Sequence, residues 1–100
     1  MNTIPPQSFS EKKLTIMIQS SDGLTTASCP ELGVVGFGRS RESATKEVYD
    51  AIINNSKIVL KLKDLHESFR SEHEKILSQW APQILSNEGN IQSLFYFQQA

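Results

Sequence analysis

The single cysteine, Cys29, is the residue with which a catalytic interpretation of this sequence starts. A nucleophilic thiol needs a neighbouring base and a lowered pKa. The two histidines, His66 and His73, are seven residues apart on one expected helix, and no Asp or Asn is placed to orient either ring. Since Cys29 ends an expected strand, we expect its side chain to pack as a small hydrophobic group. We predict no catalytic residue.

Metal and phosphate binding are the other kinds of chemistry that the residue types could support. The two histidines lie about 10 Å apart along a helix, which is too far for one ion without ligands from another element. Asp22 and Glu31 belong to a turn and a loop, so nothing in their spacing brings them together for metal-dependent hydrolysis. Arg39, Arg41 and Lys46 surround a helix start, where a solvated first turn is the simpler interpretation. We predict no metal and no cofactor.

Three short strands are expected to hold these residues. Residues 14–18 alternate between apolar and polar side chains, which indicates a strand with one buried face. Asp22-Gly23 predicts a type I′ hairpin turn. Residues 24–29 return as a second strand that ends at Pro30, and residues 34–37 form a third.

A helical period begins after Ser40, which is a good N-cap residue. The tripeptide at residues 54–56 weakens this helix and could end it. Residues 58–63 fit either a strand or a further helix. We favour helix, because an apolar stripe continues as far as Pro82, where we expect the helix to stop. This stripe consists of Leu62, Leu65, Phe69, His73, Ile76 and Trp80.

The elements predict an α+β fold in two layers, with an antiparallel sheet of three strands packed against one helix and with an added C-terminal helix. Residues 91–98 are β-prone and could form a fourth strand, either completing the sheet or offering an edge to a partner. We divide the chain into a disordered leader at 1–11, a module at 12–57 and a C-terminal region at 58–100. The expected face for an oligomer or a partner consists of Leu65, Phe69, Ile76, Trp80, Phe95 and Phe97.

The composition narrows the class of protein. The chain has 100 residues with 10 Lys and Arg against 11 Asp and Glu, a formal net charge of −1. It makes one small domain, and association would help to stabilise so small a core, so we expect a homo-oligomer. Neither half is basic enough for a monomer to hold nucleic acid, although a dimer could double a small cluster. No apolar run approaches the roughly 18 residues of a membrane span, and one cysteine suits a reducing cytoplasm.

Two motifs carry a resemblance to a known family. Cys29-Pro30-Glu31-Leu32 ends the second strand, and Gly38-Arg39-Ser40 opens the helix, in which Ala44 and Ala51 follow. With the hairpin before them, these motifs resemble the HicB family, which comprises antitoxins of bacterial type II toxin–antitoxin pairs and their solitary relatives. The resemblance covers roughly the first half of the chain. Ser43 stands where the family has the Glu of a helix capping box, so we expect that reciprocal cap to be missing.

The resemblance implies a partial ribonuclease H-like fold without the nuclease's carboxylate cluster. It also implies a non-enzymatic protein that binds a protein partner, which for an antitoxin is a small toxin ribonuclease. The motif residues are expected to shape the fold or the partner surface; they are Cys29, Pro30, Glu31, Leu32, Gly38, Ser40 and Ala44. Residues 64–100 contain no recognisable DNA-binding region. A DNA-binding autoregulator and an uncharacterised small enzyme are the alternative hypotheses.

Overall fold

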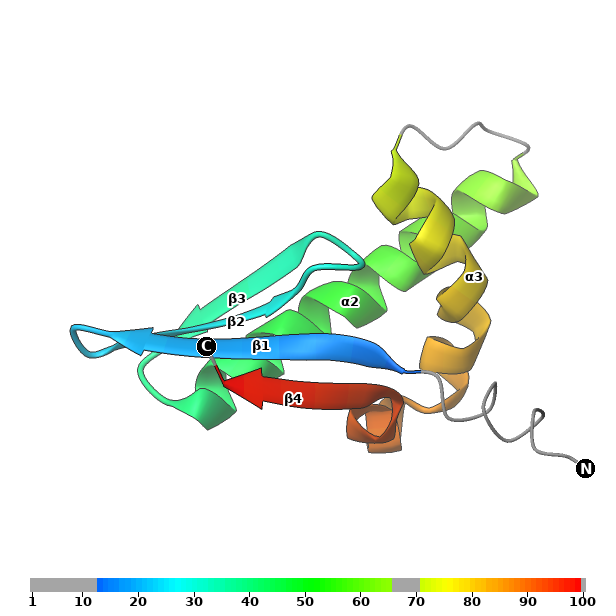
Figure 1. Ribbon diagram of the computed structural model, residues 1–100. Coiled ribbons are helices and arrows are strands. Elements are labelled where there is room, and N and C mark those ends of the chain that lie inside the picture. The colour runs from blue at the N-terminus through cyan, green and yellow to red at the C-terminus, as the bar shows by residue number, and fades with distance from the viewer. Residues whose placement is uncertain (1–12, 66–70, 100) are drawn as a thin grey trace, which may run out of the picture.

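The computed structural model describes residues 13–65 and 71–99, and the expected leader therefore lies outside the described residues. The strands form one sheet, and the helices pack on one side of it (Figure 1). In chain order the elements are β1 (Leu14–Ser21), β2 (Leu24–Cys29), β3 (Val34–Gly38), α2 (Arg41–Asp64), α3 (Glu72–Ser86), the 3₁₀ helix η1 (Glu88–Leu94) and β4 (Phe95–Gln99).

The first three strands form the predicted antiparallel meander. Strands β1 and β2 pair from Met17↔Ser28 to Ser21↔Leu24, and β2 pairs in turn with β3. The turn between β1 and β2 has φ of 53° at Asp22 and 80° at Gly23. These left-handed values are those that a type I′ hairpin requires, so the Asp-Gly prediction is confirmed.

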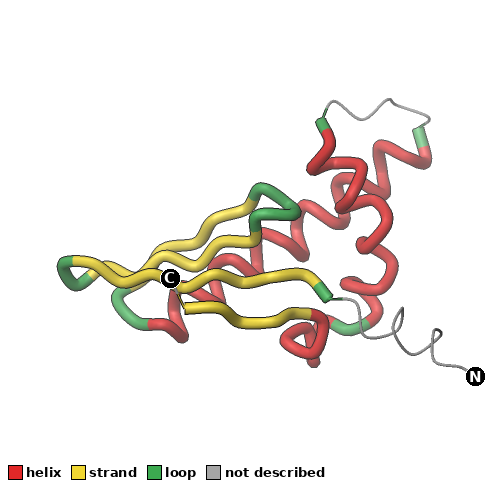
Figure 2. Tube along the Cα trace, in the orientation of Figure 1, coloured by secondary structure: helices red, strands yellow, loops and turns green. Residues whose placement is uncertain are grey.

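The expectation of a purely antiparallel sheet is wrong, because the fourth strand joins it in the parallel sense. The strand order is β3-β2-β1-β4, and β4 pairs with β1 from Leu14↔Phe95 to Ile18↔Gln99. Parallel neighbours need a crossover connection. Here α2, α3 and η1 together carry the chain from one edge of the sheet, β3, to the other (Figure 2).

Helix α2 packs across one face of the sheet and is longer than the sequence suggested. Its buried side chains include Val48, Ile52, Ser56 and Val59. Residues 54–56 do not end this helix. The Ser56 side chain is buried, but its hydroxyl donates a hydrogen bond of 2.7 Å to the Ile52 carbonyl, so that burying this polar group inside the helix leaves it satisfied. Residues 58–63 are helical, as favoured, and the expected boundary after residue 57 falls inside this helix.

Helix α3 packs on α2 and does not stop at Pro82. The Ser71 side chain caps its start by accepting from the Glu74 N–H at 3.2 Å. Proline inside a helix costs about 3 kcal/mol. Ala81 and Ile84, on either side of Pro82, are fully buried, and this burial offsets that cost. The single stripe predicted from Leu62 to Trp80 is therefore divided between two helices, with Phe69 in the undescribed segment between them.

One hydrophobic core lies between the sheet and the two helices. Its largest fully buried apolar side chains are Ile16, Ile18, Val48, Ile52 and Ile84. Glycine at position 36 allows the close contact between β3 and α2, because a Cβ there would lie 2.6 Å from the Val48 nitrogen. Within residues 13–65 and 71–99, no helix has the length and apolar character needed to cross a membrane.

Candidate protein-interaction surface

The motif Cys29-Pro30-Glu31-Leu32 forms the tight turn between β2 and β3. Main-chain N–H groups of Leu32 and Gly33 both donate to the Cys29 carbonyl, at 3.1 and 2.9 Å. The Leu32 side chain is buried in the core. Pro30 has no N–H to give to a strand ladder, which is why β2 ends at this point. The main role of this motif is therefore to form the turn and to anchor it in the core.

The Glu31 carboxylate fastens this turn to β1. It accepts the main-chain N–H of Thr15 at 3.2 Å and the Thr15 hydroxyl at 2.8 Å. The β1–β2 ladder begins only at Met17, so Glu31 supplies Thr15 with the acceptor that the second strand no longer offers. The Glu31 carboxylate therefore takes the place of a β2 carbonyl as the hydrogen-bond acceptor for β1, beyond the point where β2 ends at Pro30.

Cys29 lies in the core and is not arranged as a nucleophile. Its side chain is fully buried, and Sγ donates to Glu31 Oε1 at 3.7 Å. Burial, together with the nearby Glu31 charge, raises the pKa of the thiol to about 12, so the thiol is protonated at neutral pH. It packs as the small hydrophobic group that we expected.

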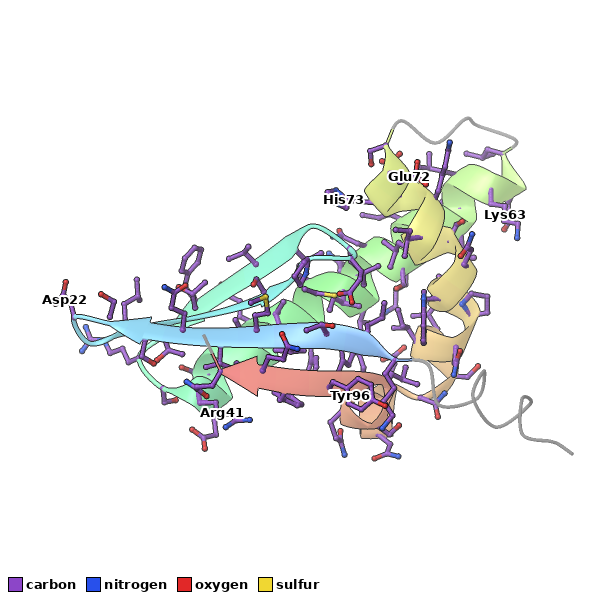
Figure 3. The ribbon with its side chains drawn as sticks, in the orientation of Figure 1. Asp22, Arg41, Lys63, Glu72, His73 and Tyr96 are labelled. Carbon is purple, nitrogen blue, oxygen red and sulfur yellow. The ribbon has the colours of Figure 1, made fainter. Side chains whose placement is uncertain are left out.

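Among the described residues, His73 forms no hydrogen bond with Cys29. His73 is exposed on α3, and its ring lies beside Gly33 of the β2–β3 turn (Figure 3). It borders a cavity of about 190 Å³ with Leu32 and Leu77. His66 lies outside the described residues. Among the residues that the structure describes, no group of three or more His, Cys, Asp or Glu could hold a metal ion.

The second motif builds the start of α2. The Ser40 side chain accepts the Ser43 N–H at 3.1 Å, and the Ser43 hydroxyl accepts the Ser40 N–H at 3.2 Å. The reciprocal capping box that we expected to be missing is therefore present, because Ser43 takes the place of Glu. Gly38 ends β3 where a Cβ would lie 2.6 Å from the nitrogen of Ala44, which is itself buried.

Two of the three basic residues at this helix start, Lys46 and Arg41, are engaged within the chain. Lys46 Nζ forms an ion pair with Asp50 at 2.9 Å. The Arg41 guanidinium lies over the Phe97 ring, 5.1 Å from its centroid. These contacts favour the solvated first turn over a phosphate site.

The sheet has one face that none of the described helices covers, and we call it the open face. Val35 and Phe37, on β3, are 47% and 51% exposed there, and Tyr96, on β4, is exposed beside Lys13, whose Nζ lies 5.1 Å from the ring centroid. The alternation of burial along the strands assigns the open face to Thr15, Met17, Gln19, Leu24, Thr26, Ser28, Val35, Phe37, Tyr96 and Gln98. None of these strand residues is charged. Val35 and Phe37 form an exposed apolar pair at the β3 edge of this face, and neighbouring exposed apolar side chains are typical of a protein-binding surface.

A groove of about 460 Å³ lies on the other side of the sheet, between α2 and the segment η1–β4. Phe97 and Ile91 give it apolar walls, and Arg41 and Glu42 stand at its rim. Tyr49 packs beneath, with its ring 5.4 Å from that of Phe95. Burial raises the pKa of the Tyr49 hydroxyl to about 12. Within the described part of the chain, this hydroxyl has no hydrogen-bond partner.

The residues expected as an oligomer or partner face come from several elements, and Phe69 among them lies outside the described residues. Phe95 is buried, and Ile76 and Trp80 are partly buried against the core. Leu65, at the end of α2, and Phe97, on the groove, are exposed. Sequence reasoning missed Val35 and Phe37 as surface residues. The glycines at 36 and 38 are the signal that could have found them, since small residues facing the helix turn Phe37 outward.

Comparison with known proteins identifies a similar fold. No family model matches the sequence, and no curated protein matches it. A solved structure from Syntrophomonas wolfei subsp. wolfei, the antitoxin part of a proposed toxin/antitoxin system, superimposes with a TM-score of 0.74 at 12% sequence identity. The alignment covers 94% of this chain and 68% of that one. The chain therefore has the fold of that antitoxin over nearly its whole length.

Proposed function

We propose that this protein is a non-enzymatic, HicB-like antitoxin that acts by binding a protein toxin. The observation that carries the proposal is the likeness in fold to an antitoxin over 94% of the chain. The motifs of the β2–β3 turn and the helix start, through which the sequence resembles the HicB family, support the same assignment. The meander, helix and returning strand are also compatible with the partial ribonuclease H-like arrangement that the resemblance implies.

The partner that we propose is a small toxin ribonuclease, which the protein would inhibit by covering its active face. Binding needs a surface whose side chains are not already used in the fold. The open face meets this requirement at β3, because Val35 and Phe37 present an apolar and an aromatic group to solvent. Aromatic side chains contribute much of the binding energy at protein interfaces. We place the complex in the cytoplasm, where the free thiol of Cys29 stays reduced.

The test of this proposal is co-expression with the reading frame adjacent to the gene. We expect that frame to encode a small protein that arrests growth alone, and we expect the present chain to restore growth and co-purify with it. An adjacent product without toxicity or without capture by this chain would contradict the antitoxin role. The chain would then be reduced to a solitary relative of the family.

A pair of variants locates the contact. Phe37→Lys places a charge in the open face, and Ile58→Lys places one on α2 at a residue of similar exposure, 54%. We expect Phe37→Lys to lose rescue and to weaken toxin binding by at least about tenfold. The matched Ile58→Lys variant should rescue growth fully, and equal loss in both variants would exclude the open face as the specific contact.

A further inference from the structure

The two edge strands of the sheet, β3 and β4, differ in what contacts their outward-facing main-chain groups. At the β3 edge, the main-chain N–H of Phe37 donates to the Glu47 carboxylate of α2 at 2.9 Å. A charged side chain that occupies an edge donor discourages the addition of another strand. Gly36 also holds β3 tightly against α2. The β3 edge is thus closed by the chain's own helix.

Among the residues that the structure describes, the β4 edge has none of these protections. Its sequence, Phe-Tyr-Phe-Gln-Gln, contains no charged residue, proline or glycine. Pairing with β1 in the register Ile16↔Phe97 uses the main-chain groups of alternate residues, and the Thr15 N–H is directed to the opposite side, toward Glu31. The main-chain groups of Phe95, Phe97 and Gln99 therefore point away from β1. Within residues 13–65 and 71–99, no side chain hydrogen-bonds to the main chain of Phe97.

We propose that β4 pairs in antiparallel fashion with β4 of a second copy of this chain, about a two-fold axis at Phe97. The sheet then runs without interruption through both copies. A second copy fits this edge because antiparallel pairing about a two-fold axis is self-complementary: Phe97 both donates to and accepts from the same residue of the other copy.

The side chains beside β4 are suited to contact with their own copies. The groove next to Phe97 carries two basic residues, Arg41 and Lys46, and three acidic ones, Glu42, Asp50 and Glu88. Because both signs are present, two such grooves can face each other and exchange ion pairs without a large net repulsion. Phe97, 37% exposed in the single chain, would pack against its equivalent.

This inference is independent of the proposed antitoxin function, and its test needs only the purified chain. Sedimentation equilibrium over a concentration series is expected to find a dimer. Phe97→Pro removes an outward N–H and leaves the inward groups of residues 96 and 98 to pair with β1, so this variant should be a monomer. Phe37→Lys, on the closed edge, should remain a dimer.

A cysteine at the two-fold axis tests the register. Directly opposed residues in a hydrogen-bonded antiparallel pair lie about 5.5 Å apart between Cα atoms, which a disulfide can bridge. Phe97→Cys should therefore oxidise to a covalent dimer, whereas Val35→Cys on β3 should not. The buried Cys29 does not compete.

Three results would overturn the proposal. They are a monomeric unaltered chain at every concentration, a dimer that persists in a folded Phe97→Pro variant, and a failure of Phe97→Cys to cross-link. The cross-linking result decides the question even where the proline variant does not fold. A monomeric chain whose Phe97→Pro variant loses toxin capture would assign the edge to the toxin instead of to a second copy.

Discussion

The β2–β3 turn and the neighbouring part of the open face on β3 differ in the surroundings of their side chains. In the turn, Cys29 and Leu32 are buried and Glu31 is bonded to Thr15. On the open face, Val35 and Phe37 contact solvent. The residues that carry the family resemblance therefore hold the fold together, and those we assign to binding form no recognisable motif. Changes in the turn should lower stability, and changes on the open face should alter partner binding.

The largest loss of stability is expected from Leu32→Ala. This side chain is 4% exposed and anchors the turn in the core. Its truncation should lower the free energy of unfolding by about 2–5 kcal/mol, through lost burial and the cavity left behind. Urea unfolding followed by circular dichroism measures this difference. A loss below that of an exposed-residue control would contradict the anchoring role.

Alkaline pH should weaken the fold through Cys29. Burial raises the pKa of this thiol from 9.0 to about 12. The unfolded chain therefore loses the proton first as the pH rises. The associated stability is present below pH 9 and is lost between pH 9 and 12, by about 1.4 kcal/mol per pH unit.

Cys29→Ala provides the control for that pH dependence. Unfolding measured at a series of alkaline pH values should fall less steeply for this variant than for the unaltered chain. Identical slopes in the two proteins would show that the thiol is not protected in the folded state.

A smaller loss is expected from Glu31→Ala. The variant leaves the Thr15 N–H and hydroxyl without the carboxylate that accepts both. We expect a cost of about 1–3 kcal/mol. Glu31→Gln keeps one acceptor oxygen and should lose less. Equal stability of all three proteins in thermal unfolding would exclude Glu31 as the fastening between the turn and β1.

The smallest effect on stability is expected from Phe37→Lys. About half of this side chain is already in contact with solvent. The free energy of unfolding should change by less than about 0.5 kcal/mol. A loss as large as that of Leu32→Ala would mean that Phe37 supports the fold, and the contrast between the two regions would then fail.

The strands of the meander and the first turn of α2 could be predicted from local patterns. Alternation set residues 14–18 in a strand, Asp22-Gly23 defined the hairpin, and Ser40 marked the helix start. These features depend on neighbouring residues alone, which is why sequence reasoning found them.

Features that depend on distant packing were missed. Pro82 lies within α3 because burial of its neighbours outweighs its local preference. The parallel direction of β4 depends on the path that α2, α3 and η1 take back to the sheet, which one apolar stripe could not reveal. The sequence also did not reveal which face of β3 is buried. Gly36 faces the helix, and the larger, apolar Phe37 faces solvent. The open face was therefore absent from the predicted site.

The most direct measurement of the central claim is the dissociation constant of the toxin complex for two variants with opposite expected behaviour. We predict that Phe37→Lys weakens binding at least about tenfold at unchanged stability, and that Glu31→Gln loses stability while its folded form binds normally. Normal binding by Phe37→Lys, or lost affinity in folded Glu31→Gln, would contradict the assignment of the open face to the toxin.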